Sequence, residues 1–378
     1  MMMSYEEELL PHDVIIEILS WLPPKKLLKF RSVCKSWNST ISNAKFIVEH
    51  QSHFGNLTNN NNGCIVIATR KDSGSLTSLK LSLVQDSNPE MVYDIMESKF
   101  DVTECYSIMG SCNGLFCWAS FRIDDGPIQL CNPSIRWTTL VPPFPFNKNF
   151  LFPHVFRYCY GVGFDRFAID YKVVKFIGPL SDSRHGIAAI YSVMAKSWKI
   201  VNSPVPSYLI CGFSWSFFLH GFIHWLVYSH KKYKIILFDI CNNVFREMQL
   251  PVINGDNNEI SIYAVKNSLC LLETKTEVDS KIYHVSIMKE YGIAESWTKQ
   301  FSIVLKNGIS KCITLTVGGK FLCSAEKSNG LSQLILYDSE RNEYINVGEA
   351  QAPTLTCANI CPLVATLQLL DVVGNYRN

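Results

Sequence analysis

The chain has 378 residues, which is long enough for two domains with a large buried core. Apolar residues make up 47% of it and charged residues only 18%, a composition that excludes a disordered or collagen-like chain. The net charge is +2, so nothing in the charge balance favours a protein that binds nucleic acid through bulk charge.

The fourteen cysteines do not indicate a secreted disulfide framework. Glu6, Glu7 and Glu8 stand where a secretory signal carries Lys or Arg, and no apolar segment follows them. We therefore expect a cytoplasmic or nuclear protein whose cysteines are free and mostly buried. The uncharged stretch 200–228 contains prolines and alternates apolar with polar residues, so it predicts buried strands rather than a membrane helix.

Residues 9–42 have the pattern of three short helices. Pro11 and Asp13 suit a helix start, and Pro23 with Pro24 ends the first helix. On one side of the first helix, apolar residues recur at helical spacing: Ile15, Ile18, Leu19 and Leu22. The other side is also apolar, at Val14, Ile16 and Trp21. Composition alone leaves two interpretations open, a helical cap on the main domain and a hairpin that binds a partner.

The string LPHDVIIEILSWLPPKKLLKFRSVCKSW, from Leu10 to Trp37, resembles an F-box. The resemblance implies that residues 5–45 dock on the Skp-type adaptor of a cullin-RING ubiquitin ligase. We expect the adaptor to be bound by apolar and proline side chains of this segment, namely Leu10, Pro11, Ile18, Leu19, Leu22, Pro23, Leu27 and Leu28. Five cationic residues between 25 and 35 have a single aromatic residue, Phe30, among them and no repeated aromatic interleaving that would support base stacking. They predict a solvated face or a complement to an acidic adaptor rather than a nucleic-acid site.

The polar segment 46–62 is expected to be a linker, and residues 63–373 read as short β-type runs separated by turns. Two markers recur in that region every fifty residues or so. The first is a Gly or Asn turn followed by an apolar strand, at Gly63, Gly114, Gly163, Gly221, Asn267 and Gly319. The second is a strand, a polar turn and an aromatic residue, at Trp137, Trp198, Phe245, Trp297 and Tyr344.

A period near fifty predicts four-stranded blades, and six marker positions predict a kelch-like β-propeller of about six blades after the all-α unit. The segment 361–370 is expected to close the ring against the first blade. A β-sandwich, in which the period would be accidental, is the alternative fold.

Several of these strings, among them GSCNGLFC, LCNPSIRW and ILFDICNNVFREMQLP, resemble the F-box-associated interaction domain of plant F-box proteins. Cys131 and Phe164 depart from the Trp or Tyr that is more common in that family. The resemblance implies the substrate-recognition subunit of an SCF-type ligase, whose β domain binds a target protein for ubiquitination and degradation. The string YDSERNEYINVG resembles the pollen S-locus subgroup, which would make the target an S-RNase.

Signatures of catalysis are missing from the sequence, which has no GxxxxGK, GxSxG, HExxH or CxxC string. His220 and His224 would lie about 13 Å apart along a strand, too far to share a metal ion. The aspartates at strand ends, Asp165, Asp170, Asp239 and Asp338, are expected to accept hydrogen bonds in turns. We therefore predict a non-catalytic protein with no metal and no cofactor. The alternative function is a β-propeller lectin or small-ligand-binding protein with a helical cap.

The longest marker gaps are 58 residues from Gly163 to Gly221 and 61 from Trp137 to Trp198. The extra sequence includes Val141–Tyr158, with phenylalanines between prolines, and the polar loop Gly178–Gly186. Insertions in a propeller map to loops on one face, often the binding face. These loops predict a target-binding rim formed by Phe144, Phe146, Phe150, Phe152, Arg184 and His185. The alternative is that the phenylalanines fill space between blades.

Overall fold

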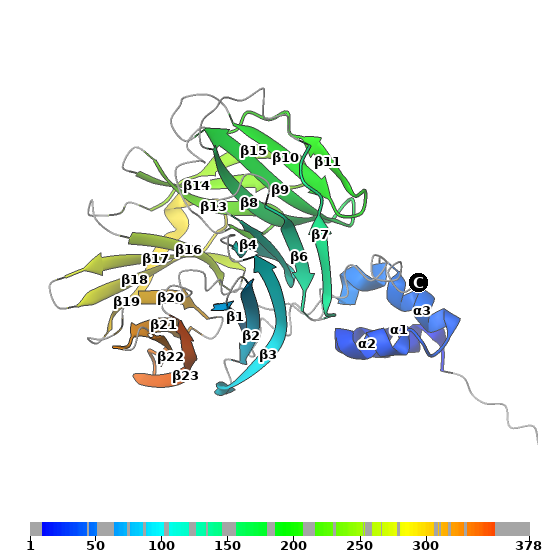
Figure 1. The fold of residues 1–378 in the computed structure, drawn as a ribbon, viewed down its shortest axis with the longest axis horizontal. Coiled ribbons are helices and arrows are strands. Elements are labelled where there is room, and N and C mark those ends of the chain that lie inside the picture. Colours follow the sequence, from blue (N-terminus) through cyan, green and yellow to red (C-terminus); the bar gives the residue numbers. More distant parts are fainter. Residues whose placement is uncertain are drawn as a thin grey trace, which may run out of the picture.

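A computed structural model shows a helical unit followed by a β domain (Figure 1). It describes residues 10–43, 45–50, 64–73, 76–85, 88–101, 106–120, 126–133, 135–145, 156–179, 186–206, 216–229, 232–251, 253, 259–265, 267–277, 280–305, 309, 311–316, 319–328 and 331–351.

The N-terminal unit contains α1 (His12–Ser20), α2 (Pro24–Phe30), α3 (Lys35–Ser42) and a further helical segment at residues 45–50. The segment 46–62, which we expected to be a linker, therefore begins as helix, and its remainder lies outside the described residues. Pro23 precedes α2 and Pro24 occupies its first turn, where the missing N–H costs nothing. The small core of this unit consists of Leu19, Leu27, Ile41, Phe46 and Ile47. A helical unit of this size has room for few buried side chains, so much of its apolar surface is left outside the core.

The first three blades contain β1 (Cys64–Ser73), β2 (Leu76–Gln85), β3 (Asn88–Asp101), β4 (Tyr106–Cys112), β5 (Leu115–Ser120), β6 (Ile128–Asn132), β7 (Trp137–Val141), β8 (Phe156–Asp165), β9 (Asp170–Pro179), β10 (Ile187–Ser192) and β11 (Ser197–Ile200). The last three contain β12 (Ser216–Leu219), β13 (Phe222–Ser229), β14 (Lys232–Asp239), β15 (Val244–Met248), β16 (Glu259–Val265), β17 (Ser268–Thr276), β18 (Lys281–Met288), β19 (Trp297–Leu305), β20 (Lys311–Leu315), β21 (Phe321–Glu326), β22 (Leu331–Asp338) and β23 (Glu343–Gln351). A 3-10 turn, Ala294–Ser296, precedes β19.

The strands form six consecutive antiparallel groups, which we number blade 1 (β1–β3), blade 2 (β4–β7), blade 3 (β8–β11), blade 4 (β12–β15), blade 5 (β16–β19) and blade 6 (β20–β23). The first strands of neighbouring blades contact one another from β4 to β20, and β23 contacts β1 and β3. The last blade therefore meets the first, and the propeller is confirmed over the sandwich. The segment 361–370, which we expected to close the ring, lies outside the described residues.

Blades 2 and 4 are linked directly at the centre, where β12 pairs in parallel with β4 through Ser216 opposite Gly110. The Ser216 hydroxyl also donates to the carbonyl oxygen of Met109 at 2.9 Å. A Cβ at Gly110 would collide with the Ser216 hydroxyl, so this close approach requires glycine. The parallel pairing shows that the two first strands run in the same direction.

The aromatic marker is confirmed in all five positions, because each falls at the first or second residue of a fourth strand, in β7, β11, β15, β19 and β23. The turn marker is correct at Gly114, Gly221, Asn267 and Gly319, each between the first and second strands of its blade. It is wrong at Gly163, which lies inside β8; the turn of that blade is residues 166–169. A Cβ at Gly163 would meet the Phe218 ring at 3.0 Å, so this glycine allows two blades to pack closely. Gly63 lies outside the described residues.

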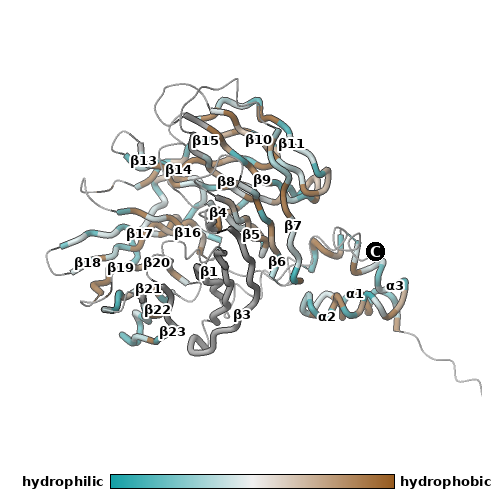
Figure 2. The backbone as a smooth tube through the Cα atoms, viewed as in Figure 1, coloured by the Kyte–Doolittle hydropathy of each residue, from teal (hydrophilic) through white to brown (hydrophobic). Residues whose placement is uncertain are grey.

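Hydrophobic segments run along the strands (Figure 2). They form core clusters between neighbouring blades; one joins Leu115 and Leu130 of blade 2 to Tyr160 and Val173 of blade 3. Among the described residues, nine cysteines are free thiols, and seven of these are buried. Burial raises the pKa of the Cys117 thiol to about 12, as expected for an inert core thiol.

The uncharged stretch 200–228 contributes strands β12 and β13 where it is described, which confirms the strand prediction. Within the described part of the chain, no helix combines the length and the hydropathy needed to cross a bilayer.

Candidate functional site

An apolar stripe on the helical unit is exposed to solvent. Leu10, Val14, Ile18 and Trp21 follow one another at helical spacing along α1, with exposed fractions of 57%, 41%, 49% and 53%. The Trp21 ring is held on the surface because its indole N–H donates to the Glu17 carboxylate at 2.9 Å. These four side chains, which we call the α1 stripe, form a surface that a partner could cover.

A neighbouring side of α1 faces the small core. Ile15, Leu19 and Leu22 lie at i, i+4 and i+7, and all three belong to the core cluster or pack against it. The sequence interpretation placed Ile18 in the same stripe as these residues. The structure assigns it to the α1 stripe instead.

The eight predicted adaptor-binding residues divide into three groups. Leu10, Pro11, Ile18 and Pro23 are exposed, whereas Leu22 and Leu28 are half-buried against the core. Leu19 and Leu27 have 1% and 0% of their surface exposed. A side chain without exposed surface cannot contact a separately folded partner, so the role of these two leucines is to hold the helices together.

Sequence reasoning did not select three exposed residues, Val14, Trp21 and Val33, as contacts. For the first two, a signal was present, because Val14, Ile18 and Trp21 lie at i, i+4 and i+7. Val33 lies between α2 and α3, where no helical period identifies a face.

Cations cover the second part of the helical unit. Lys25, Lys26, Lys29 and Lys35 are exposed, and Arg31 donates from Nε to the Asn38 side-chain oxygen at 2.7 Å. No Asp or Glu occurs from residue 24 to 42. This part of the helical unit therefore carries a run of positive charge.

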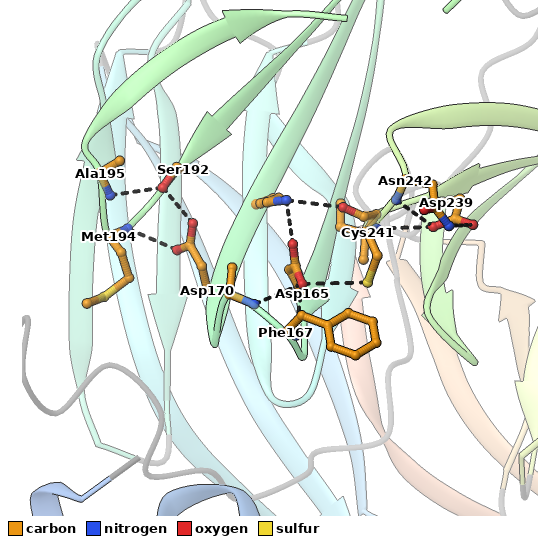
Figure 3. A network of polar contacts seen from close by, with 12 residues as sticks. Asp165, Phe167, Asp170, Ser192, Met194, Ala195, Asp239, Cys241 and Asn242 are labelled. Carbon is orange, nitrogen blue, oxygen red and sulfur yellow. Dashed lines mark hydrogen bonds and ion pairs between the residues drawn. The ribbon is translucent and has the colours of Figure 1, made fainter. Parts of the chain in front are cut away.

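In the β domain, the predicted aspartates form a network of turns (Figure 3). The Asp165 carboxylate accepts from the backbone N–H groups of Phe167 and Ala168 at 3.0 and 3.1 Å. Its other oxygen accepts from the Lys172 ammonium at 2.6 Å. The Lys172 ammonium also donates to the Ile240 carbonyl at 3.2 Å, which connects blade 3 to blade 4.

The other three aspartates act in the same way, so the prediction of turn hydrogen bonding is confirmed for all four. Asp170 accepts from the Met194 N–H at 2.9 Å, and Asp239 accepts from the Asn242 N–H at the same distance. Asp338 accepts from the Glu340 N–H at 3.0 Å. Each carboxylate fixes a turn at the end of a strand.

The protonation of these carboxylates follows their surroundings. Burial alone would raise the pKa of Asp165, but hydrogen bonds from Lys172, Ala168 and Phe167 hold it below its ordinary value. The pKa of Asp239 is likewise lowered, against the effect of burial, by bonds from Asn242. Burial raises the pKa of Asp170 in spite of its bond from Ser192.

His224 is a core residue rather than a ligand. Its Nε2 lies 2.9 Å from the Tyr291 hydroxyl, its ring stacks on Phe217, and burial lowers its pKa to about 3. His220 lies 2.8 Å from the Asn267 carbonyl oxygen and so connects the turns of blades 4 and 5. Among the described residues, no group of three or more His, Cys, Asp or Glu side chains is arranged to bind a metal ion.

The structure corrects one member of the predicted target-binding rim. Phe144 is buried against Ile177 and Ala189, and its ring lies 5.5 Å from the Trp198 ring. Trp198 also donates to the Pro142 carbonyl at 2.8 Å. Phe144 thus fills space at the edge of blade 3, as the alternative interpretation stated. The other five predicted residues, Phe146, Phe150, Phe152, Arg184 and His185, lie outside the described residues.

Comparison with known families agrees with this architecture. The F-box domain family matches residues 8–49. The family described as the F-box associated beta propeller domain matches residues 64–360, well over half of the chain. This chain is an F-box protein with an F-box-associated β-propeller domain.

Relatives of this F-box protein occur in Arabidopsis thaliana. An F-box/kelch-repeat protein is 28% identical over 319 residues, covering 78% of this chain and 71% of the relative. The F-box protein CPR1 is 24% identical over 324 residues, covering 78% and 73%. Among solved structures, a protein from Bacteroides uniformis described as a 6-phosphogluconolactonase has a TM-score of 0.42 at 9% identity, covering 80% of this chain and all of that one, a likeness too weak to support a conclusion.

Proposed function

We propose that this F-box protein is the substrate-recognition subunit of an SCF-type cullin-RING ubiquitin ligase. The helical unit binds a Skp-type adaptor, which connects it to the cullin scaffold, and the β domain binds a target protein for ubiquitination and degradation. The observation that carries the proposal is the exposed α1 stripe in the segment that matches the F-box. The protein itself breaks no bond; it contributes proximity between the target and the ubiquitin-conjugating enzyme.

The α1 stripe supplies the driving force in this proposal. Burying a large apolar side chain contributes about 1.5 to 3 kcal/mol, so covering Leu10, Val14, Ile18 and Trp21 favours a stable complex even after the entropy cost of association. We assign direct contacts to the exposed residues Leu10, Pro11, Ile18 and Pro23 of the predicted set, and we add the three exposed residues that were missed, Val14, Trp21 and Val33. The cationic face of α2 and α3 would meet acidic groups of the adaptor and accelerate association.

A matched pair of substitutions tests the adaptor site. Leu10 and Val304 have nearly equal exposed fractions, 57% and 58%, but lie in the helical unit and on β19 of the propeller. Leu10→Asp should abolish co-purification of the full-length protein with a purified Skp-type adaptor and cullin, because it places a charge in the apolar contact. Val304→Asp should leave co-purification unchanged. Equal behaviour of the two variants, with circular dichroism unchanged, would contradict the proposal.

A milder variant separates contact from folding. The double substitution Leu10→Ala with Pro11→Ala removes two exposed side chains and no core residue. We expect weaker adaptor binding and an unchanged unfolding transition of the β domain. Full retention of adaptor affinity would argue that the α1 stripe has another occupant.

The narrower version of this proposal is a pollen S-locus determinant whose target is an S-RNase. Only the tail string YDSERNEYINVG supports it, and the relatives named above carry no such description. Purified S-RNase should bind the protein in surface plasmon resonance if this version holds. Absence of binding would remove the S-locus role and leave the receptor role intact.

A further inference from the structure

The ends of blades 2 to 4 present one continuous set of short turns. In an antiparallel four-stranded blade, the turn between the first and second strands lies at the same end as the turn between the third and fourth. Because β4 and β12 run parallel, these turns of blades 2 and 4 lie on one face of the domain. We call this surface the turn face and define it by residues 113–114, 133, 135–136, 166–169, 193–196, 220–221 and 240–243.

Hydrogen bonds across blades hold the turn face rigid. The Tyr171 hydroxyl donates to the Asn113 carbonyl at 3.4 Å, from blade 3 to blade 2. The Cys241 thiol of blade 4 lies 3.6 Å from the Asp165 carboxylate of blade 3. Figure 3 shows the contacts of Asp170 with Met194, of Asp165 with Cys241 and of Asp239 with Asn242. A surface held in this way loses little conformational entropy when a ligand binds.

Three large apolar side chains are exposed on the turn face of blade 3. Phe167 is 76% exposed, Met194 is 55% exposed and Ile169 is 40% exposed. Phe167 and Met194 lie on adjacent turns, whose backbones are held by Asp165 and Asp170, residues paired at the ends of β8 and β9. The fixed backbone therefore presents apolar surface to solvent.

The conformation of Ile169 adds an independent observation. Its φ is +51°, in the left-handed region where a β-branched residue is rare and strained. Glycine or asparagine would occupy this position at lower conformational cost. The isoleucine thus costs conformational energy and still leaves 40% of its surface exposed, which is typical of a position kept for contact with a ligand.

Charge on the turn face has one sign. Arg136, Arg166 and Lys196 are exposed there, and the Arg166 guanidinium lies 4.8 Å from the Phe167 ring centroid. None of the residues that define the turn face is Asp or Glu, and the carboxylates at the flanking strand ends are buried in the network. The equivalent turns of blades 5 and 6 differ, because they expose Glu290, Glu295 and Glu340.

We propose that the turn face of blades 2 to 4 is where the β domain binds its target, and that it takes an acidic segment bearing bulky apolar side chains. The apolar side chains of the segment would cover Phe167, Met194 and Ile169, and its carboxylates would pair with Arg136, Arg166 and Lys196. This inference rests on the receptor function proposed above. It places recognition at the opposite ends of the blades from the loops within 141–158 and 178–186, which connect β7 to β8 and β9 to β10.

The first test uses a defined peptide and the full chain bound to its adaptor. A fluorescein-labelled peptide alternating acidic residues with Leu and Phe should bind, and the same peptide with Lys in place of each acid should not. Phe167→Ser and Met194→Ser should each weaken binding about tenfold or more. Ile293→Ser should have no effect, because Ile293 is similarly exposed at 45% but lies between Glu290 and Glu295 in blade 5. Equal binding of the two peptides, or equal effects of the three variants, would overturn the inference.

Ile169→Asn separates recognition from a structural role. It should raise the thermal unfolding midpoint, because asparagine tolerates the left-handed conformation, and it should weaken peptide binding. A residue that only supported the fold would not show these opposite changes. Lower stability together with unchanged binding would contradict the proposal.

A cellular readout distinguishes the failure of this inference from the failure of the receptor function. Target proteins of this receptor should accumulate in cells that lack its gene. When the double variant Phe167→Ser with Met194→Ser is expressed in those cells, it should still co-purify with the adaptor, but the accumulated proteins should not be degraded. If the double variant restores their degradation, or if exchanging residues 141–158 and 178–186 changes which proteins are degraded, the turn face is not the target site, although the receptor function stands. If the unmodified protein does not bind the adaptor, the receptor function itself is refuted. If light scattering shows a dimer that Phe167→Ser dissociates, the occupant is a second copy of the chain.

Discussion

The helical unit and the β domain place their apolar side chains in opposite ways. On α1, apolar residues with exposed fractions above 40% alternate with buried ones, so one side packs and the other is left to solvent. In the β domain, the largest side chains, such as Trp118, Trp225 and Phe321, are almost completely buried between strands. Exposed apolar residues of the propeller lie both on strands, as Leu140, Ile200 and Val304 do, and on the turns of blade 3, where Phe167, Met194 and Ile169 are exposed. A short helical unit offers a partner the surface that it cannot bury, whereas a large domain can bury nearly everything and expose apolar side chains at selected positions.

The largest expected effect tests whether the helical unit and the β domain fold independently of each other. Trp225 packs between blades 3 and 4, and its indole N–H donates to the Tyr160 carbonyl at 3.0 Å. Trp225→Ala should reduce the free energy of unfolding of the β domain by about 3 to 5 kcal/mol and leave adaptor affinity unchanged. Urea denaturation followed by tryptophan fluorescence, with titration calorimetry of the adaptor, measures both quantities.

The matched change in the helical unit is Leu27→Ala, which should lower adaptor affinity by destabilising the helices and leave the unfolding of the β domain unaltered. If either substitution changed both properties, the helical unit and the propeller would be energetically coupled and the comparison would fail.

The next largest effect concerns an exposed side chain that we expect to contact the adaptor but that does not belong to the core of the helical unit. Trp21 belongs to the α1 stripe, and the hydrogen bond to Glu17 fixes its ring on the surface. Trp21→Ala should weaken adaptor binding by about 2 kcal/mol, because tryptophan is a frequent hot spot of interfaces. Its effect on helix stability should be small, since the ring contributes nothing to the core. Glu17→Gln is the control: it keeps an oxygen that can accept the indole N–H, so adaptor affinity should change little.

Sequence patterns predicted the parts of this molecule that repeat. The aromatic marker found every fourth strand from blade 2 to blade 6, because a strand, a polar turn and an aromatic residue lie next to one another in the chain. The glycine marker failed at Gly163, since a glycine that lets two blades approach looks the same in sequence as a glycine in a turn. Leu19 and Leu27 were predicted as contacts because they are apolar residues of the string that resembles an F-box, and only packing distinguishes a core leucine from a surface one.

The turn face could not be found from sequence because its contacts are remote. Asp165 and Cys241 are 76 residues apart, and Tyr171 and Asn113 are 58 apart. The turn role of each aspartate was predictable from its local neighbours, but the joining of the turns into one rigid surface was not. The exposure of Phe167 and Met194 depends on the same long-range arrangement.

Acid should weaken the turns of the propeller. The pKa values of Asp165 and Asp239 in the folded protein lie below the ordinary value of 3.8. These carboxylates therefore stabilise the folded state above about pH 4, and that stabilisation is lost as the pH falls through their lowered pKa values. Asp170, whose pKa is raised, opposes the trend, because its protonation relieves the cost of burying its charge.

Asp239→Asn should cost about 1 to 2 kcal/mol near neutral pH, since the buried carboxylate accepts bonds from Asn242 and Arg246. In urea denaturation the difference between this variant and the unmodified protein should shrink as the pH falls through the lowered pKa of Asp239, because the carboxylate then becomes protonated. A cost that does not depend on pH would show that the charge of Asp239 contributes little to the turn.

The smallest expected effect tests whether Ile169 packs within this chain or is exposed for contact with a target. Ile169 has a positive φ, which strains its backbone, and 40% of its surface is exposed. Left-handed backbone costs an ordinary residue about 1 kcal/mol or more, and asparagine tolerates it. Ile169→Asn should therefore increase the free energy of unfolding of the β domain by about 1 kcal/mol, measured by urea denaturation. The matched control is Asn243→Ile in the β14–β15 turn, where φ is +57°; the reverse exchange should lower the free energy by a similar amount. If Ile169→Asn instead destabilised the domain, the isoleucine would be packing within this chain, and the propeller would bury its apolar residues on the turn face as it does between its blades.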